Sequence, residues 1–232
     1  MKEKQISAEA SPLPEPGLAL VEENKSGQSL GDKGHRTRQR IIEATRSLIE
    51  SSGVVVPTAR AVARAVKLAA PTFYLYFEDV GEAVLAVIQQ MHDELNPVID
   101  LLAAEWPPEN LFDCAQSFVT AYYDYWTAHA ALLRVRNRMA DEGDDRFVAL
   151  RARSVDRLTE TLAGKLTLPV LPIRVAVRRE DLAAALVIGL ERSATVYALG
   201  LYPYIGRDRS ALIDALALLI ANSMRVEPAS DR

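Results

Sequence analysis

The sequence predicts an all-α fold of about nine helices, on the basis of three observations. Apolar residues recur at the spacing of a helix, about 3.6 residues, along most of the 232-residue chain. Helix-capping residues and helix breakers separate these stretches from one another. Strict alternation of apolar and polar residues is absent, as is an Asn-Gly hairpin turn, and the valine run at 54–56 is too short and isolated for a strand.

The N-terminal segment differs from the rest of the chain. Residues 1–35 combine prolines and glycines with scattered charges and almost no aromatic or β-branched residue, which predicts a disordered tail. A first helix is expected from near Arg36, with Ile41 and Leu48 on its apolar face. Gly53 is a natural C-terminal stop for that helix.

Two short helices and one longer helix are expected next. Thr58 can cap a helix over 58–66, and a third helix is expected over 69–76. Asp79 and Glu82 have the spacing of a capping box for a longer fourth helix. Pro97 should perturb that helix or lie near its end, and the prolines at 107 and 108 must end it. The later helices are expected over 111–128, 130–140, 144–166, 179–199 and 208–224.

The net charge of −4 hides an uneven distribution. Residues 36–78 carry seven basic and three acidic side chains, a local charge of +4. The segment before them has a charge of −2, and the segment after them has a charge of −6. A compact basic block in an acidic chain is expected where phosphates are contacted, although a solvated face is the simpler reading of charge alone.

Several classes of protein are not indicated by the sequence. Cys114 is the single cysteine, so no internal disulfide can form, which fits a cytoplasmic protein. The three histidines, His35, His92 and His129, are scattered, so we expect no metal and no cofactor. No phosphate-binding glycine loop, zinc-protease motif or serine-nucleophile motif is present, so we do not expect an enzyme. No apolar run is long enough to span a bilayer, and no signal peptide is expected.

The two short helices, 58–66 and 69–76, follow the helix-turn-helix pattern. Val62 and Ala63 of the first short helix should face inward, as should Leu68, Phe73 and Phe77 around the second. Such a unit packs through its first helix and presents the second helix to the major groove. Many helical hairpins share the pattern, so the residues themselves must decide whether it binds DNA.

These residues carry a resemblance to a known family. The segment Arg40-Ile41-Ile42-Glu43-Ala44, then 58–63, then Pro71-Thr72-Phe73-Tyr74-Leu75-Tyr76-Phe77, resembles the DNA-binding domain of TetR-family transcriptional regulators. The resemblance covers about residues 36–92. The remaining helices resemble the family in number and length, which implies a variable domain for effector binding and dimerisation.

The resemblance implies roles for individual residues at the start of this domain. Thr58 would contact a phosphate, and Arg60 would contact a guanine through two hydrogen bonds, or a phosphate. Arg36, Arg38 and Arg40 would steer the first helix along the DNA backbone.

In the third helix, Ala70, Pro71 and Thr72 would face base edges. Ala70 and Pro71 can make only apolar contacts, for which a thymine methyl group is the natural partner. Tyr74 and Tyr76 would donate their hydroxyls to phosphates, or else serve as packed aromatic residues.

Three positions depart from the family pattern. Lys67 stands where the family usually has the turn glycine, so either the turn has another conformation or a left-handed residue is tolerated there. Ala69 replaces a capping serine or threonine. The stretch 78–82 lacks the usual phosphate-binding lysine at the start of the fourth helix. These departures suggest modest affinity, or specificity that depends on Arg60 and on DNA shape.

An effector pocket is expected among the C-terminal helices. Aromatic residues cluster between 106 and 126, and they serve either as ordinary core or as the lining of a pocket for a small, largely apolar molecule. The arginines at 134, 136 and 138 could bind an acidic effector, but surface salt bridges, such as one from Arg138 to Glu142, are the preferred reading. The candidate pocket residues are Phe118, Tyr122, Trp126, Met139 and Tyr197.

A dimer interface is expected on the last two long helices. Small residues recur every four positions in the first of them and permit close approach of another helix, with packing inside the chain as the alternative. A twofold DNA site requires a dimer with recognition helices about 34–36 Å apart. The candidate interface residues are Ala185, Gly189, Ser193, Leu212, Ala215 and Leu219.

The sequence therefore predicts a homodimeric regulator, more plausibly a repressor, that binds a palindromic double-stranded DNA operator and is released by a small-molecule effector. We expect a tail over 1–35, a helix-turn-helix domain over 36–92 and an effector-binding and dimerisation domain over 93–232. The alternative is a helical ligand-binding or interaction module in which the helix-turn-helix has decayed.

Overall fold

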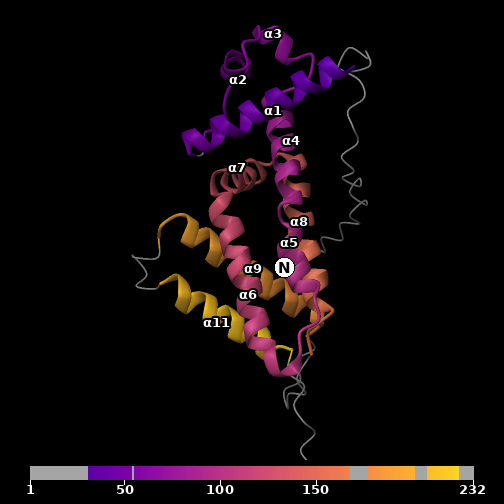
Figure 1. Cartoon of the computed structure of the whole chain (residues 1–232), viewed down its shortest axis with the longest axis vertical. Coiled ribbons are helices and arrows are strands. Elements are labelled where there is room, and N and C mark those ends of the chain that lie inside the picture. The colour runs from indigo at the N-terminus through magenta and orange to yellow at the C-terminus, as the bar shows by residue number, and fades with distance from the viewer. Residues whose placement is uncertain (1–30, 54, 168–176, 202–207, 225–232) are drawn as a thin grey trace, which may run out of the picture.

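The computed structural model describes residues 31–53, 55–167, 177–201 and 208–224, and within them it shows only helices and loops (Figure 1). These residues form ten α-helices and one 3-10 helix, which confirms the all-α class. Most of the tail expected over 1–35 lies outside the described residues. In chain order the elements are α1 (Asp32–Ser52), α2 (Ala59–Ala65), α3 (Ala70–Phe73), α4 (Val80–Asp93), α5 (Asn96–Ala103), η1 (Pro108–Asn110), α6 (Leu111–Ala128), α7 (Ala130–Asp141), α8 (Asp145–Ala163), α9 (Arg179–Ala198) and α11 (Arg209–Asn222).

The first helix begins earlier than the sequence predicted. α1 starts at Asp32, four residues before Arg36, with an acidic side chain in its first turn where the helix dipole favours one. It ends as expected at Gly53, whose positive φ of 81° closes the last turn through a hydrogen bond from its N–H to the Ile49 carbonyl. The buried residues Ile41 and Ile49 place the predicted apolar face against the core.

The fourth helix predicted from sequence is two helices, which is the main correction to the predicted elements. α4 ends at Asp93 and α5 begins at Asn96, with the chain turning at Glu94 and Leu95. Pro97 is the second residue of α5, where its missing N–H needs no partner because the first turn of a helix has no intrahelical acceptor for it. The proline therefore starts a new helix and does not end the old one.

The helices form an elongated molecule with α1, α2 and α3 at one end (Figure 1). α4 leaves that end and runs along the body, while α7 lies beneath α1 and contacts it. In the body, α6 packs against α9 and α11, and α8 packs between α7 and α9. One continuous cluster of buried side chains extends from Ile41 in α1 to Ile220 in α11. None of the helices in the described residues is long and apolar enough to span a bilayer.

Candidate functional site

The helix-turn-helix unit is formed by α2 and α3, packed onto α1 and held by a few large apolar side chains. Val62 and Ala63 are buried, as predicted for the inner face of α2. Phe73 and Phe77 are fully buried, with ring centroids 5.6 Å apart. α3 covers only Ala70–Phe73, less than the predicted 69–76, and turns continue it to Phe77.

The turn between these helices resolves the first departure noted in the sequence. Lys67 has a φ of +59°, and among the described residues it is the one non-glycine residue with positive φ. Its N–H bonds to the Arg64 carbonyl at 3.1 Å, and the Leu68 N–H bonds to the Ala63 carbonyl at 2.8 Å. This pair of hydrogen bonds is the Schellman motif, which requires a left-handed residue at the position of Lys67. The glycine-like geometry is kept although the glycine is absent.

The outer face of the unit presents most of the predicted contact residues. Thr58, Arg60 and Pro71 are exposed, while Ala70 and Thr72 are half-buried. The Thr58 hydroxyl accepts a hydrogen bond from the Ala61 N–H at 3.2 Å, so it caps α2 and still has its own O–H to donate. Ala69, at the corresponding position of α3, makes no side-chain cap.

The two tyrosines of this segment have different surroundings. Tyr74 is 52% exposed and meets the buried Phe73 ring edge-on, with centroids 5.4 Å apart. Its hydroxyl is therefore presented outward. Tyr76 is half-buried and packs against the core cluster, so the packing role left open for it fits its position better.

Two of the three arginines predicted to steer α1 along DNA make contacts with other segments of the protein. The Arg38 guanidinium lies 4.8 Å from the centroid of the Phe77 ring, and partial burial lowers its pKa. Arg40 Nη2 donates to the Val66 carbonyl at 2.8 Å and so ties α1 to the end of α2. Arg36 is exposed and bonds only within its own helix, through Nε to the Asp32 carbonyl. Arg36 and Arg40 are both exposed, and of the three arginines Arg36 alone makes no contact outside its own helix among the described residues.

A cation from another helix lies at the start of α4, and the sequence did not predict it. Asp79 caps α4 by accepting from the Glu82 N–H at 2.6 Å, which confirms the predicted start of the helix. Arg146 from α8 bonds to both Asp79 and Asp144 there. Partial burial acts to raise the pKa of Asp79, but its hydrogen bond from Arg146 lowers it below the usual range. A Cβ on Gly81 would lie 2.5 Å from Arg146 Nη2, so glycine leaves room for this contact.

Neither of the two spaces found among the described residues is lined by all five candidate pocket residues. Phe118, Tyr122 and Trp126 are buried neighbours on α6, and the Phe118 and Tyr122 rings lie 6.4 Å apart. Met139 is half-buried on α7, and Tyr197 stacks near Tyr123 with centroids 5.8 Å apart. Helical spacing placed the three α6 residues together correctly, but the other two lie on elements whose neighbours the sequence does not reveal.

A small void does border two of these residues. Its volume is about 10 Å³, and it is lined by Tyr122, Trp126, Arg136, Ser154 and Glu191 together with apolar side chains. That is room for one water molecule at most. Burial raises the pKa of the Tyr122 hydroxyl, and the nearby Glu191 charge raises it further, so Tyr122 remains a neutral phenol.

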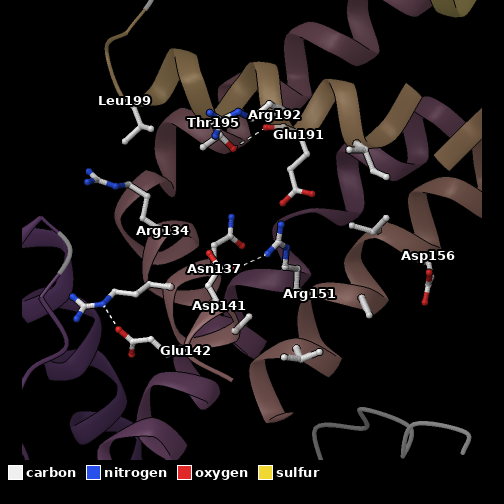
Figure 2. A pocket seen from close by; sticks show the side chains of 16 residues that line it. Arg134, Asn137, Asp141, Glu142, Arg151, Asp156, Glu191, Arg192, Thr195 and Leu199 are labelled. Atoms are coloured by element: carbon white, nitrogen blue, oxygen red, sulfur yellow. Dashed lines mark hydrogen bonds and ion pairs between the residues drawn. The ribbon is translucent and has the colours of Figure 1, made fainter. Parts of the chain in front are cut away.

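A much larger cleft of about 1140 Å³ opens on the surface between α7, α8 and α9 (Figure 2). Its walls mix charged side chains, such as Arg134, Arg192 and Asp156, with apolar ones, such as Val155 and Ile188. The sequence did not predict this cleft, because it arises from the packing of three helices far apart along the chain.

The three arginines of α7 have three different surroundings. Arg138 pairs with Glu142 at 2.8 Å, as predicted from their spacing of four residues. Arg136 is buried and pairs with Glu191 of α9 at 2.9 Å, which sequence reasoning had not anticipated. Arg134 lines the large cleft and has no hydrogen bond or ion pair to any other described residue.

Two histidines lie where α4 meets the body. Ser154 Oγ of α8 is 3.1 Å from His92 Nε2, and it also lies 3.5 Å from Arg136 Nη1. Burial lowers the pKa of His92 to about 4, and the nearby Arg136 charge adds to the effect. His129 Nε2 lies 3.2 Å from Oε2 of Glu94, a residue that also binds Arg46 of α1. Within the described residues no cluster of three or more potential metal ligands occurs.

The candidate dimer residues lie partly on outward faces of α9 and α11. Ala185, Gly189 and Ala215 are exposed, and Leu219 is 56% exposed. A Cβ on Gly189 would meet nothing within 4 Å, so the surface beside it is open. Ser193 and Leu212 turn toward the interior: the Ser193 hydroxyl bonds to Tyr123 at 2.5 Å, and Leu212 packs against the core. Ile188 and Leu218, both about half exposed, extend the outward apolar surface.

Comparisons with known proteins find one family model that matches part of the chain. Residues 100–191 match the family model described as the Tetracyclin repressor-like C-terminal domain. This match covers helices that the sequence analysis had related to the family only by number and length. No curated protein sequence matches the chain.

Solved structures share the fold over most of the chain. The fatty acid degradation regulator FadR from Bacillus halodurans aligns with a TM-score of 0.57 and 17% identity, over 84% of this chain and 97% of that one. A putative TetR-family regulator from Mesorhizobium loti gives a TM-score of 0.54 and 18% identity, over 82% and 95%. A regulatory protein of the tetR family from Rhodococcus gives 0.53 and 17%, over 83% and 99%. Residues 100–191 therefore resemble the Tetracyclin repressor-like C-terminal domain, and the chain as a whole shares the fold of these solved regulators.

Proposed function

We propose that this protein is a homodimeric repressor whose α2–α3 unit binds a palindromic operator and whose C-terminal helices bind a small effector that releases the DNA. The observation that carries the proposal is the outer face of α2 and α3, where Thr58, Arg60, Pro71 and Tyr74 are all exposed. Such a face offers one bidentate donor for a base edge, apolar contact for a thymine methyl group and hydroxyls for phosphates.

The proposed mechanism is a shift between two dimer states. A twofold operator is matched only when the two recognition helices lie about one helical turn of DNA apart, roughly 34–36 Å. An effector that binds better to a dimer with another spacing shifts the population toward that dimer and releases the operator. α4 is suited to transmit such a change, because it packs on α1 and also contacts α7.

Charge supports the same orientation on DNA. The basic block at 36–78 coincides with α1, α2 and α3, while the acidic remainder forms the body. We propose that the protein works in the cytoplasm, with the body repelling DNA and the helix-turn-helix end docking. Because two of the α1 arginines are engaged internally, few cations remain, and the affinity should fall moderately with added salt.

The test is a selection of bound duplexes from a random pool, followed by gel shifts on the selected operator. Arg60→Ala should weaken operator binding by tenfold or more and relax discrimination at one base pair, because a bidentate guanine contact contributes about 1–3 kcal/mol. Arg64→Ala removes the same charge from the exposed side of the same helix and serves as the matched control. It should weaken binding less and to the same degree for all sequences.

The second candidate function is a ligand-binding or interaction module with a decayed helix-turn-helix. The acidic start of α4, where Asp79 and Glu82 form the cap, favours it because two carboxylates near phosphates weaken DNA binding. Failure of the wild-type protein to enrich any duplex, or equal binding by wild type and both variants, would replace the repressor proposal with this one.

A further inference from the structure

A buried ion pair lies in the centre of the effector-binding end of the molecule. Arg136 is 4% exposed and Glu191 is 9% exposed, and Nη2 of the arginine lies 2.9 Å from Oε1 of the glutamate. The other two contacts of the Arg136 guanidinium are to neutral groups. Its Nε donates to the amide oxygen of Asn137 at 3.0 Å, and its Nη1 lies 3.5 Å from Ser154 Oγ. A buried guanidinium needs a carboxylate beside it, and Glu191 is the carboxylate present.

Glu191 separates two spaces of very different size. The open cleft between α7, α8 and α9 is lined by Glu191 but not by Arg136 (Figure 2). The internal void is lined by both residues. Val155 borders both spaces as well. Glu191 and Val155 therefore form the partition between the solvent-filled cleft and the interior.

The positions of Glu191 and Arg136 decide which of the two side chains can move out of the ion pair. The Glu191 side chain lies on the cleft wall, so rotation about its own bonds can bring its carboxylate into water. The Arg136 side chain is only 5% exposed and is not part of the cleft wall. Removal of Glu191 alone would leave a buried, uncompensated cation, so a carboxylate from outside must take its place.

The cleft is suited to attract such a carboxylate. Two of its ion pairs are closed, Arg138 with Glu142 and Arg151 with Asp141. Among the described residues, the arginines at 134 and 192 and the aspartate at 156 line the cleft without an ion pair. Two unpaired cations against one unpaired anion favour the entry of an anion.

Beyond the ion pair, the void is walled by aromatic and aliphatic side chains. Tyr122, Tyr125 and Trp126 come from α6, and Leu95 and Leu158 come from the α4–α5 turn and α8. Its present volume of about 10 Å³ means that these side chains must move apart to admit a ligand. The surface that they would expose suits an apolar chain and not a second charge.

We propose that the effector is an amphipathic carboxylate: its carboxylate takes the place of Glu191 on Arg136, and its apolar chain enters between Tyr122, Tyr125 and Trp126. Glu191 is then a built-in counter-ion that holds the site closed until the ligand arrives. This inference rests on the proposed function as an effector-responsive regulator. Ser154 and His92 connect Arg136 to α4, the helix that leads to the DNA-binding end. A movement of the Arg136 guanidinium would therefore change the contacts of α4.

The experiment measures binding of two matched probes to the full-length protein without DNA, by the change in tryptophan fluorescence. Decanoate carries the carboxylate, and decanol has the same chain without it. Glu191→Gln removes the internal competitor, so decanoate should bind at least tenfold more tightly than to wild type, while decanol should change less than threefold. In the double variant Arg136→Gln/Glu191→Gln, decanoate should lose its preference over decanol.

Controls separate the site from general effects of charge and folding. The double variant Arg138→Gln/Glu142→Gln removes an exposed ion pair from the same cleft and should leave both affinities unchanged. Thermal unfolding checks that each variant is folded. Because Arg136→Gln/Glu191→Gln has no unpaired buried charge, it remains a valid test even if Glu191→Gln alone unfolds.

Three results would overturn the proposal: equal changes for decanoate and decanol in Glu191→Gln, a preserved decanoate preference in the double variant, or no decanoate binding to any of these proteins. Gel shifts on the selected operator are run separately. Decanoate binding as expected with no selected operator would defeat the regulator function and leave the carboxylate site standing. An operator that is bound but never released by decanoate, together with no decanoate binding, would defeat the carboxylate site and leave the regulator function standing.

Discussion

At Lys67 the backbone has a left-handed conformation that glycine usually provides. The Schellman motif after α2 needs a left-handed residue, and the Lys67 φ of +59° meets that need at a cost. A non-glycine residue in this region is typically strained by about 1–2 kcal/mol. Because Val62 and Phe73 on either side of the turn are fully buried, the packing of the two helices holds the strained turn in place.

Lys67→Gly should therefore stabilise the protein, by up to about 1 kcal/mol in the free energy of unfolding. The relief of strain exceeds the additional entropy that glycine loses on folding, which is roughly 0.5–1 kcal/mol. Lys67→Ala keeps the strain and removes the same exposed side chain, so it is the matched control and should stay within about 0.5 kcal/mol of wild type. Urea unfolding measures both variants, and equal stability of the two would show that the turn is not strained.

At the scale of elements, α4 is the link between the two ends of the molecule. Its N-terminus is held by Arg146 of α8. Its C-terminal part carries Gln90, which donates a hydrogen bond to Gln39 of α1, and His92, which lies against Ser154 of α8. These contacts join α4 to α8 near both of its ends and to α1 near its C-terminal end. A shift of α8 must therefore move α4 or break one of these contacts.

The buried His92 makes this link sensitive to pH. Its pKa is about 4 in the folded protein against about 6.5 when unfolded, so the unfolded state binds more protons between these values. Burial of the neutral His92 has no free-energy cost above pH 6.5, where the ring is also neutral in the unfolded chain. The free energy of unfolding therefore falls as the pH drops from 6.5 toward 4. From pH 7 to pH 5 we expect His92 to cost the protein on the order of 2 kcal/mol of unfolding free energy.

His92→Gln should remove most of this loss, whereas His35→Gln in α1 should leave it unchanged. Urea unfolding at pH 7 and pH 5 measures the difference for each protein. A residual loss is expected in His92→Gln, because burial also lowers the pKa of His129. If His92→Gln loses as much stability as wild type, the histidine is not buried in its neutral form at the α4–α8 contact.

At the scale of the whole molecule, apolar surface remains uncovered on α9 and α11. Ile188, Leu218 and Leu219 are each about half exposed, and small residues lie between them. Both helices pack through their other sides, α9 on α8 and α6, and α11 on α6. An exposed apolar surface of this kind is the usual place for a partner subunit, and the twofold symmetry of an operator calls for one.

Leu219→Asp should therefore shift the protein from dimer to monomer, because an aspartate in an apolar interface loses its hydration without gaining a partner. The dimer dissociation constant should rise at least a hundredfold, as measured by sedimentation. Leu101→Asp changes another exposed leucine, 41% exposed on α5, and should leave the dimer intact. A monomeric wild type, or dissociation in both variants, would contradict an interface on these helices.

The sequence by itself determined the helical class, most helix limits and the caps at Thr58 and Asp79, because these depend on residues within a few positions of each other. It also identified the helix-turn-helix unit and the unusual position of Lys67. It failed where the partners are far apart in the chain. The pairing of Arg136 with Glu191 spans 55 residues and that of Arg146 with Asp79 spans 67. Only the packing of α4, α7, α8 and α9 decides those pairs, because a charge carries no local signal of which distant partner it will meet. The tertiary structure therefore decided which arginines of α1 contact other segments and where a cleft opens between α7, α8 and α9.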